Sequence, residues 1–247
     1  MQRYFLTFAL AFFPTWMVRG LVEMMGHRIE AQVKVGFSLL FCDQLSLSSG
    51  SQIGHFNFIK VDSLSLGEHA KVGRLNIFRG PVDVLLEEYS EIGNRNVVAR
   101  APLGVTTQRA ELRLQKGSKI TAGHSIDSAC SVSFGEYSIL AGKGSQIWTH
   151  GYVHAETGSG RYRIDGPVSL GDNVYLGSSV IISGGVSICN RAMVGAGVAV
   201  TRDLKEPGFY VSAPIRMLPR PCDPETRDDL VRTEDPSLLE TVYIKKR

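Results

Sequence analysis

The sequence lacks the features that are typical of several protein classes. Its net charge is only +3, and no basic run carries interleaved aromatic residues, which argues against nucleic-acid binding. Its four cysteines have none of the paired spacing that zinc sites and small disulfide frameworks use; they are Cys42, Cys130, Cys189 and Cys222. We therefore expect reduced, mostly buried thiols in a cytoplasmic protein.

An apolar run long enough to cross a bilayer is also lacking. The N-terminal run from Tyr4 to Phe13 ends at Pro14 and is about half as long as the roughly 20 residues that a crossing takes. No small-residue cleavage site follows it. Beyond Pro14, the spacing of Met17, Leu21 and Met25 is that of a helix with one apolar stripe.

We expect residues 1–26 to form a hydrophobic and amphipathic helix, for which two interpretations stay open. It caps the open end of the core, or it makes a peripheral contact with the inner face of the cytoplasmic membrane through residues 1–25.

The main positive signal is an aliphatic residue at every sixth position. The last such run consists of Leu170, Leu176, Ile182, Ile188, Val194 and Val200. Further runs with the same spacing are Ile29, Val35, Phe41, Leu47, Ile53 and Ile59; Leu66, Val72 and Phe78; Leu86, Ile92 and Val98; and Leu114, Ile120, Ile126 and Val132. A period of six matches neither a helix nor a simple strand, and it predicts a parallel β-helix in which three six-residue units close one triangular coil.

The six-residue spacing fails between Ile147 and Leu170. The insertion, residues 148–168, carries His150 and His154, two of the six histidines. An excursion from a regular solenoid costs conformational entropy without extending the core, so function is the usual reason to keep one. We therefore expect the chemistry of the protein here.

A series of motifs surrounds and follows this insertion. The motifs are Ile147-Trp148-Thr149-His150, Pro167-Val168, Gly171-Asp172-Asn173-Val174-Tyr175-Leu176-Gly177, Gly195-Ala196-Gly197, Val200-Thr201-Arg202-Asp203 and Ala213-Pro214-Ile215-Arg216. In this order they resemble the catalytic end of the left-handed β-helix acyltransferases, hexapeptide-repeat enzymes that use acetyl-coenzyme A. Upstream, Ile53-Gly54-His55-Phe56-Asn57 resembles the subset associated with bacterial surface polysaccharides.

The resemblance implies an all-β, left-handed parallel β-helix and a homotrimer with sites at subunit boundaries. It also implies an acetyl-CoA-dependent O-acetyltransferase that acts on a sugar hydroxyl of a surface polysaccharide or its precursor. The β-helix domain would span residues 27–218, with the catalytic insertion at 148–168. A C-terminal tail, 219–247, would be helical, because Asp223 and Asp235 each precede a proline in the manner of a helix start.

The resemblance also suggests roles for individual residues. His150 is the candidate general base in a ternary complex, and His154 is the alternative. The predicted cofactor-binding residues are Tyr175, Ser178, Ala196, Gly197, Thr201, Arg202 and Arg216. Two features depart from the family pattern: Ser212-Ala213-Pro214-Ile215 replaces its closing Gly-Asn-Pro-Ala, and Tyr175 stands where tryptophan is common.

Two other classes of function stay open. One is a zinc enzyme similar to the carbonic-anhydrase-like β-helices, with His124, His150 and His154 as conceivable ligands; our leading interpretation expects no metal. The other is a non-catalytic scaffold in a polysaccharide-synthesis complex. His55, His69 and His124 are interpreted as ladder or surface residues, although His124 lies on the part of the solenoid that an acceptor would approach.

Overall fold

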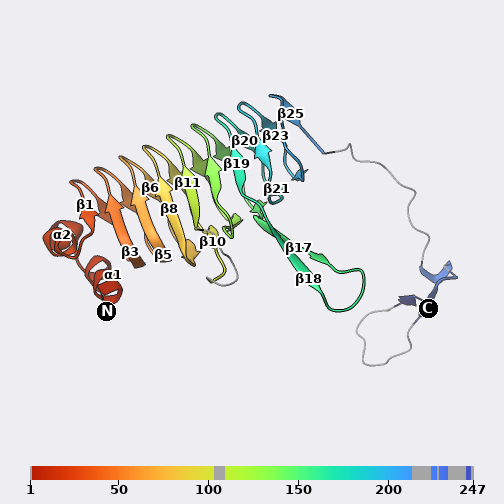
Figure 1. The fold of residues 1–247 in the computed structure, drawn as a ribbon, viewed down its shortest axis with the longest axis horizontal. Helices are drawn as coiled ribbons and strands as arrows, with labels where there is room; N and C mark the ends of the chain where they lie inside the picture. The colour runs from red at the N-terminus through yellow and green to blue at the C-terminus, as the bar shows by residue number, and fades with distance from the viewer. Residues whose placement is uncertain (1, 103–108, 213–223, 227, 233–242, 246–247) are drawn as a thin grey trace. The chain divides into compact units, whose positions relative to one another are not determined.

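The computed structural model describes residues 2–102, 109–212, 224–226, 228–232 and 243–245. The chain divides into two compact units, Met1–Ser212 and Ala213–Arg247. The first is a parallel β-solenoid with two helices at its N-terminal end (Figure 1). This confirms the predicted parallel β-helix.

The solenoid has three faces of stacked, parallel strands. The first face contains β1 (Arg28–Ile29), β3 (Leu39–Leu47), β5 (Phe58–Leu66), β8 (Val82–Leu86), β11 (Ala110–Leu114), β14 (Val132–Phe134), β19 (Val168–Leu170) and β22 (Ser187–Ile188). The second face contains β2 (Lys34–Val35), β4 (Gln52–Ile53), β6 (Lys71–Val72), β9 (Glu91–Ile92), β12 (Lys119–Ile120), β15 (Ile139–Leu140), β20 (Tyr175–Leu176), β23 (Met193–Val194) and β25 (Phe209–Tyr210).

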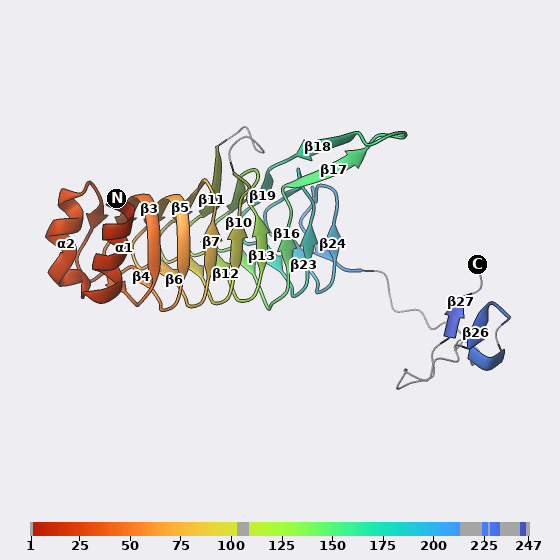
Figure 2. The same ribbon diagram turned by 90° about the horizontal axis from the view of Figure 1, so that it is seen from below.

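The third face carries the candidate functional site. Besides the first parts of β3 and β5, it contains β7 (Ile77–Arg79), β10 (Val97–Ala99), β13 (Ser125–Asp127), β16 (Gln146–Ile147), β21 (Ile181–Ile182) and β24 (Ala199–Val200). The long strands β3 and β5 continue around the corner from the third face into the first. Several strands of the third face appear side by side in Figure 2.

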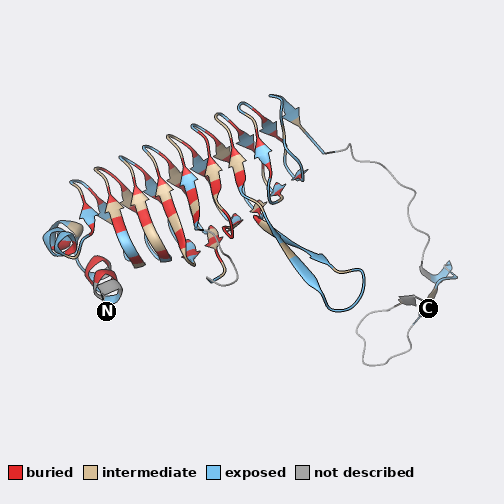
Figure 3. Cartoon of the chain, viewed as in Figure 1, coloured by how far each residue is buried: buried red, intermediate tan, exposed pale blue. Residues whose placement is uncertain are grey.

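The residues spaced by six point into the core. All six from Leu170 to Val200 are buried, and burial alternates along the strands (Figure 3). Phe41 is an exception, because Leu40 and Cys42 are the buried residues of β3 at this point. Leu40 pairs with the buried Ile59, so the inward phase here is one residue earlier than the count of six predicts.

The N-terminus forms two helices where one was expected. They are α1 (Gln2–Phe12) and α2 (Thr15–Met24), which Pro14 separates. Leu10 and Val22 are buried in the same hydrophobic cluster as Ile29 of the first coil, so the helices cover this end of the core. Neither helix, nor any other helix among the described residues, is long and apolar enough to span a membrane.

The C-terminal unit differs from the expected helical tail. Its described residues form a short 3-10 helix, η1 (Pro224–Thr226), and the antiparallel strands β26 (Leu230–Arg232) and β27 (Tyr243–Lys245). The first expected helix start thus becomes a single 3-10 turn. The second, at residues 235–237, lies outside the described residues.

A ladder of polar side chains runs along one buried corner of the solenoid. Its members, in stacking order, are Ser38, Asn57, Asn76, Asn96, His124 and Ser145. The backbone N–H of His124 donates to Asn96 Oδ1 (2.9 Å), and the N–H of Ser145 donates to His124 Nδ1 (3.2 Å). His124 is therefore a ladder residue whose Nδ1 must stay unprotonated, which confirms that interpretation and removes it from the surface.

Burial lowers the pKa of His124 from 6.5 to about 4, against the opposing effect of a hydrogen bond to the backbone of Gly142. A lowered folded-state pKa means that this histidine contributes stability above its unfolded pKa and loses it as the pH falls toward 4. We predict that the free energy of unfolding of the native protein falls by up to about 1.4 kcal/mol per pH unit between pH 6.5 and 4 because of His124. His124→Asn, which places a further asparagine in the ladder, should remove this contribution. The measurement is denaturant unfolding at several pH values.

The matched control for His124→Asn is His69→Asn at an exposed corner position. The control should keep the pH dependence of the native chain. If His124→Asn shows the same slope as the native protein, His124 does not titrate in this way.

Candidate functional site

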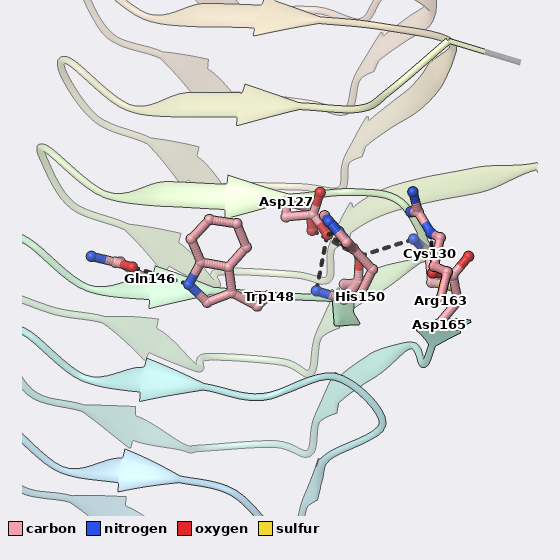
Figure 4. Close-up of polar contacts among 8 residues, drawn as sticks. Asp127, Cys130, Gln146, Trp148, His150, Arg163 and Asp165 are labelled. Atoms are coloured by element: carbon pink, nitrogen blue, oxygen red, sulfur yellow. Dashed lines mark hydrogen bonds and ion pairs between the residues drawn. The ribbon is translucent and has the colours of Figure 1, made fainter. Parts of the chain in front are cut away.

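The candidate site lies where the chain leaves the solenoid for the insertion. Strands β13 and β16 are neighbours in the third face, with Ile126 opposite Ile147. Asp127 follows Ile126 and therefore lies beside Trp148, the first residue of the insertion, and close to His150. Figure 4 shows Asp127 and His150 facing each other across this edge.

Three donors converge on one carboxylate oxygen, Asp127 Oδ2. His150 Nδ1 lies 2.8 Å away, the Thr149 hydroxyl 2.6 Å and the Thr149 backbone N–H 3.0 Å. The Thr149 hydroxyl in turn accepts a hydrogen bond from the backbone N–H of Cys130 (3.0 Å). Because the Thr149 hydroxyl accepts this hydrogen bond through its oxygen, its own proton is directed to Asp127. These contacts fix the carboxylate in place.

The contact with Asp127 determines the tautomer of His150. A carboxylate only accepts hydrogen bonds, so Nδ1 of the imidazole must carry a proton. In the neutral ring, Nε2 is then unprotonated and available to accept a proton. The His150 side chain is 23% exposed and that of Asp127 only 13%, so a ligand can reach the imidazole while the carboxylate is mostly shielded.

The insertion forms an antiparallel hairpin of β17 (His150–His154) and β18 (Arg161–Asp165), which projects from the solenoid (Figures 1 and 2). His150 pairs with Asp165 and Tyr152 with Arg163, so these side chains share one face of the hairpin. Arg163 Nε donates to Asp165 Oδ1 (2.5 Å). The base of the hairpin next to His150 is therefore a charged, hydrogen-bonded surface.

Cys130 lies among charged groups at the base of the hairpin. Burial is the main cause that raises the pKa of its thiol, and the negative charge of Asp165 adds to this, whereas Arg100 and Arg163 oppose it. The thiol is thus held in its neutral form.

His154 lies apart from His150. Four residues along an extended strand separate the two Cα atoms by about 13 Å, and His154 is exposed opposite Arg161. Of the two histidines, His150 alone is paired with a carboxylate by the described contacts. The structure brings His150 to the solenoid edge and leaves His154 out on the hairpin.

The three histidines considered for zinc do not come together. His124 is buried in the ladder, with Thr121 Oγ1 at 3.0 Å from its Nε2. His150 Nδ1 is bound to Asp127, and His154 lies along the hairpin. In the described part of the chain, no group of three His, Cys, Asp or Glu residues could hold a metal ion.

Four of the predicted cofactor-binding residues, Tyr175, Ser178, Ala196 and Gly197, lie on or beside one corner of the last coils. Ser178 packs against Gly142, where a Cβ would lie 1.7 Å from the serine hydroxyl. Gly197 adopts a positive φ of 71° and, like Ala196, is exposed. These small side chains leave the backbone of this corner open to a ligand.

Thr201 and Arg202 lie on the edge that carries His150. Strands β16, β21 and β24 are stacked in that order, with Ile147, Ile182 and Val200 aligned. Thr201 and Arg202, which follow Val200, are therefore in line with Trp148 and Thr149, which follow Ile147. Two coils, or about 10 Å, separate the two pairs. Both residues are exposed, whereas Arg216 lies outside the described residues.

Asp127 was missed by the sequence reasoning. The signal for it was present, because Ile126 and Ile147 are both core positions of the same face and Asp127 and Trp148 are the residues that follow them. Aligning the two coils would have brought Asp127 next to Thr149 and His150.

Comparisons with known proteins agree with this fold. Residues 167–202 match the family model described as the hexapeptide repeat of succinyl-transferase. The galactoside O-acetyltransferase of Escherichia coli K12 is 30% identical over 88 residues, 36% of this chain and 43% of that protein. The mitochondrial serine acetyltransferase 3 of Arabidopsis thaliana is 29% identical over 116 residues, 46% of this chain and 28% of that protein.

The chain thus spans less than half the length of these two curated relatives. Among solved structures, a polysialic acid O-acetyltransferase has a TM-score of 0.50 at 18% identity, covering 78% of this chain and 83% of that one. At this identity the likeness concerns the fold alone. The repeat spacing, the stacked parallel strands and the matching repeat model agree that the chain forms a parallel β-helix whose residues 167–202 are hexapeptide repeats.

Proposed function

We propose that the protein is an acetyl-CoA-dependent O-acetyltransferase that acts on a sugar hydroxyl of a surface polysaccharide or its precursor. The observation that carries this proposal is the Asp127–His150 pair at the edge of a hexapeptide-repeat β-helix. The partial sequence similarity to two acetyltransferases supports the reaction class. The sugar acceptor is inferred from the motif resemblance and from the name of the galactoside O-acetyltransferase, which states that this relative acetylates a galactoside.

His150 would act as the general base in direct transfer. Nε2 takes the proton of the sugar hydroxyl as its oxygen attacks the thioester carbonyl, and a C–O bond forms. The C–S bond then breaks, and the thiolate of coenzyme A leaves with the proton that His150 returns. Asp127 holds the ring in the required tautomer and stabilises the imidazolium between these two steps.

The residues at the C-terminal coils are suited to a thin, phosphorylated carrier. The corner that contains the half-buried Ser178 and the exposed Ala196 and Gly197 has only small side chains, which permits close approach to the backbone. Arg202, exposed on the His150 edge, offers charge to a phosphate. These residues would hold acetyl-CoA, whose thioester supplies the acetyl group.

We also propose a homotrimer in which a second copy provides the other wall of the acetyl-CoA groove. The hairpin supports this, because the face opposite His150 is apolar and exposed. Val153, Tyr162 and Ile164 are 51%, 64% and 59% exposed, and together they form an apolar surface that is suited to contact with a second copy.

We predict that His150→Ala lowers the rate of acetyl transfer by 10²-fold or more, because the general base is lost. The assay follows thiol release from acetyl-CoA in the presence of oligosaccharide acceptors, with mass spectrometry to detect the added acetyl group. His154→Ala is the matched control on the same hairpin strand and should lose less than about tenfold. A loss below about tenfold for His150→Ala would remove that histidine from the role.

Asp127→Asn should remove the negative charge that stabilises the His150 imidazolium while it keeps the tautomer. The amide oxygen takes the place of Oδ2, because the backbone N–H of Thr149 can only donate there, so Nδ1 of His150 stays protonated. We predict a fall in kcat of about 10- to 100-fold with KM little changed, and ¹⁵N NMR signals that still show the proton on Nδ1. Asp165→Asn, across the hairpin, is the control and should keep the native kcat. A kcat of Asp127→Asn within about twofold of the native value would contradict the proposed role of the carboxylate.

For the N-terminal helices we propose a peripheral contact with the inner face of the cytoplasmic membrane, in addition to their packing on the core. One side of each helix is buried, yet Trp16 and Met24 of α2 are 79% and 86% exposed. Met17 and Leu21 add to the same apolar surface. An amphipathic helix with such an exposed apolar face is suited to the interfacial region of a bilayer.

The double variant Trp16→Ser/Met24→Ser should bind phosphatidylglycerol-containing vesicles at least about tenfold more weakly, since each buried side chain of this size contributes about 1.5–3 kcal/mol. Vesicle co-sedimentation measures this binding. Met193→Ser, an exposed methionine on the second face, is the control. Equal sedimentation of the double variant and the native chain would exclude the membrane contact.

A further inference from the structure

A positively charged cavity adjoins the Asp127 side of the candidate site. It has a volume of about 540 Å³ and is lined by Lys60, Arg79, Gly80, Ala99, Arg100, Ala101, Pro102 and Asp127. Three cations and one carboxylate line it. Asp127 belongs to both this cavity and the His150 edge, so a ligand in the cavity extends toward the imidazole.

The strand register aligns the charged residues with Asp127. Lys60 lies opposite Arg79, Arg79 opposite Ala99, and Ala99 opposite Asp127. These outward positions form one column along the third face, on strands that Figure 2 shows in sequence. With about 4.8 Å between coils, the Cα atoms of Arg79 and Lys60 lie about 10 and 14 Å from that of Asp127.

Lys60 and Arg79 are exposed and have no ion-pair partner among the described residues. By contrast, Arg109 and Arg113 near the adjoining first face are paired with Asp83 and Glu87. The column is thus a place where the protein leaves positive charge uncompensated.

Arg100 forms a buried part of the cavity wall. Its side chain is held by a hydrogen bond from Nη1 to the carbonyl oxygen of Pro81 (2.6 Å), and the residue is only 5% exposed. Its Nε and Nη2 are buried and have no hydrogen-bond partner among the described residues. Because these two nitrogens are buried, Arg100 contributes its positive charge to the cavity and not a direct hydrogen bond to a ligand.

The charge of Asp127 does not cancel this field. Its Oδ2 already accepts three hydrogen bonds from Thr149 and His150. With Lys60, Arg79 and Arg100 against Asp127, the wall has an excess of two positive charges. A cavity whose wall has an excess of one sign of charge concentrates ligands of the opposite sign.

We propose that this cavity binds an anionic group of the acceptor, a sugar carboxylate or a phosphate, and so selects acidic oligosaccharides or nucleotide sugars. The anionic group lies at Arg79 and Lys60, and the hydroxyl to be modified lies at His150. A neutral monosaccharide cannot span the separation between them. The identity of the ligand as an acceptor rests on the proposed acetyl transfer, whereas the anion site itself does not.

The test is isothermal titration calorimetry on the full chain at low ionic strength, without acetyl-CoA. The probes are trigalacturonate, its neutral methyl ester and UDP-galactose. We expect at least one anionic probe to bind at least about tenfold more tightly than the methyl ester, and this preference to weaken as salt is added. Preference for trigalacturonate identifies a carboxylate ligand, and preference for UDP-galactose a phosphate ligand.

Arg79→Gln and Lys60→Gln each remove one exposed charge, and each should weaken anion binding by about tenfold with an unchanged melting temperature. Lys119→Gln, an exposed lysine on the second face, is the matched control and should bind as the native chain does. The proposal is overturned if the native chain binds the methyl ester as tightly as both anions, or if both cavity variants bind like the native chain.

His150→Ala separates this inference from the proposed reaction. It should retain the preference for the anionic probe while acetyl transfer is lost. Anion binding without any acetyl transfer by the native chain would contradict only the proposed reaction, and acetyl transfer without anion preference would contradict only this inference.

Discussion

Backbone hydrogen bonds between successive coils set the register on which the rest of the molecule depends. Each residue of a strand lies opposite one defined residue of the next coil, so side chains far apart in the sequence become neighbours in columns. Ile126 and Ile147 form such a pair, and their outward neighbours bring Asp127 to the edge where His150 leaves the coil. A shift of one residue would turn Asp127 into the core and separate it from His150.

The same constraint produces two different environments for histidine. In the ladder, His124 replaces an asparagine and accepts a backbone N–H, so burial keeps its ring neutral. At the edge, His150 meets a carboxylate and remains partly exposed. Whether a histidine of this solenoid is buried and neutral or exposed and paired with a carboxylate therefore depends on the column of residues in which it lies.

The sequence was sufficient to predict the solenoid because inward residues recur at a fixed interval and burial is the strongest local constraint. It failed at Phe41, where the inward phase changes by one residue within the long strand β3 and the phenylalanine contacts Tyr4 of α1 instead. The break between α1 and α2 was foreseeable from Pro14, which ends the first helix pattern. Asp127 was harder to find, because a side-chain pair formed across two coils has no local sequence pattern and appears only when the coils are aligned.

The hairpin β17–β18 leaves and rejoins the solenoid at one point. The carbonyl of Thr149 and the N–H of Gly166 are hydrogen-bonded to each other (2.8 Å), and Gly166 packs so closely on Gly185 that a Cβ would lie 2.5 Å from its nitrogen. Because this hydrogen bond closes the base of the hairpin, pairs of residues can be inserted into or deleted from β17 and β18 without shifting any coil of the solenoid. The solenoid and the hairpin can therefore evolve separately, the solenoid under selection for the stacking of its coils and the hairpin under selection for the molecules that it contacts.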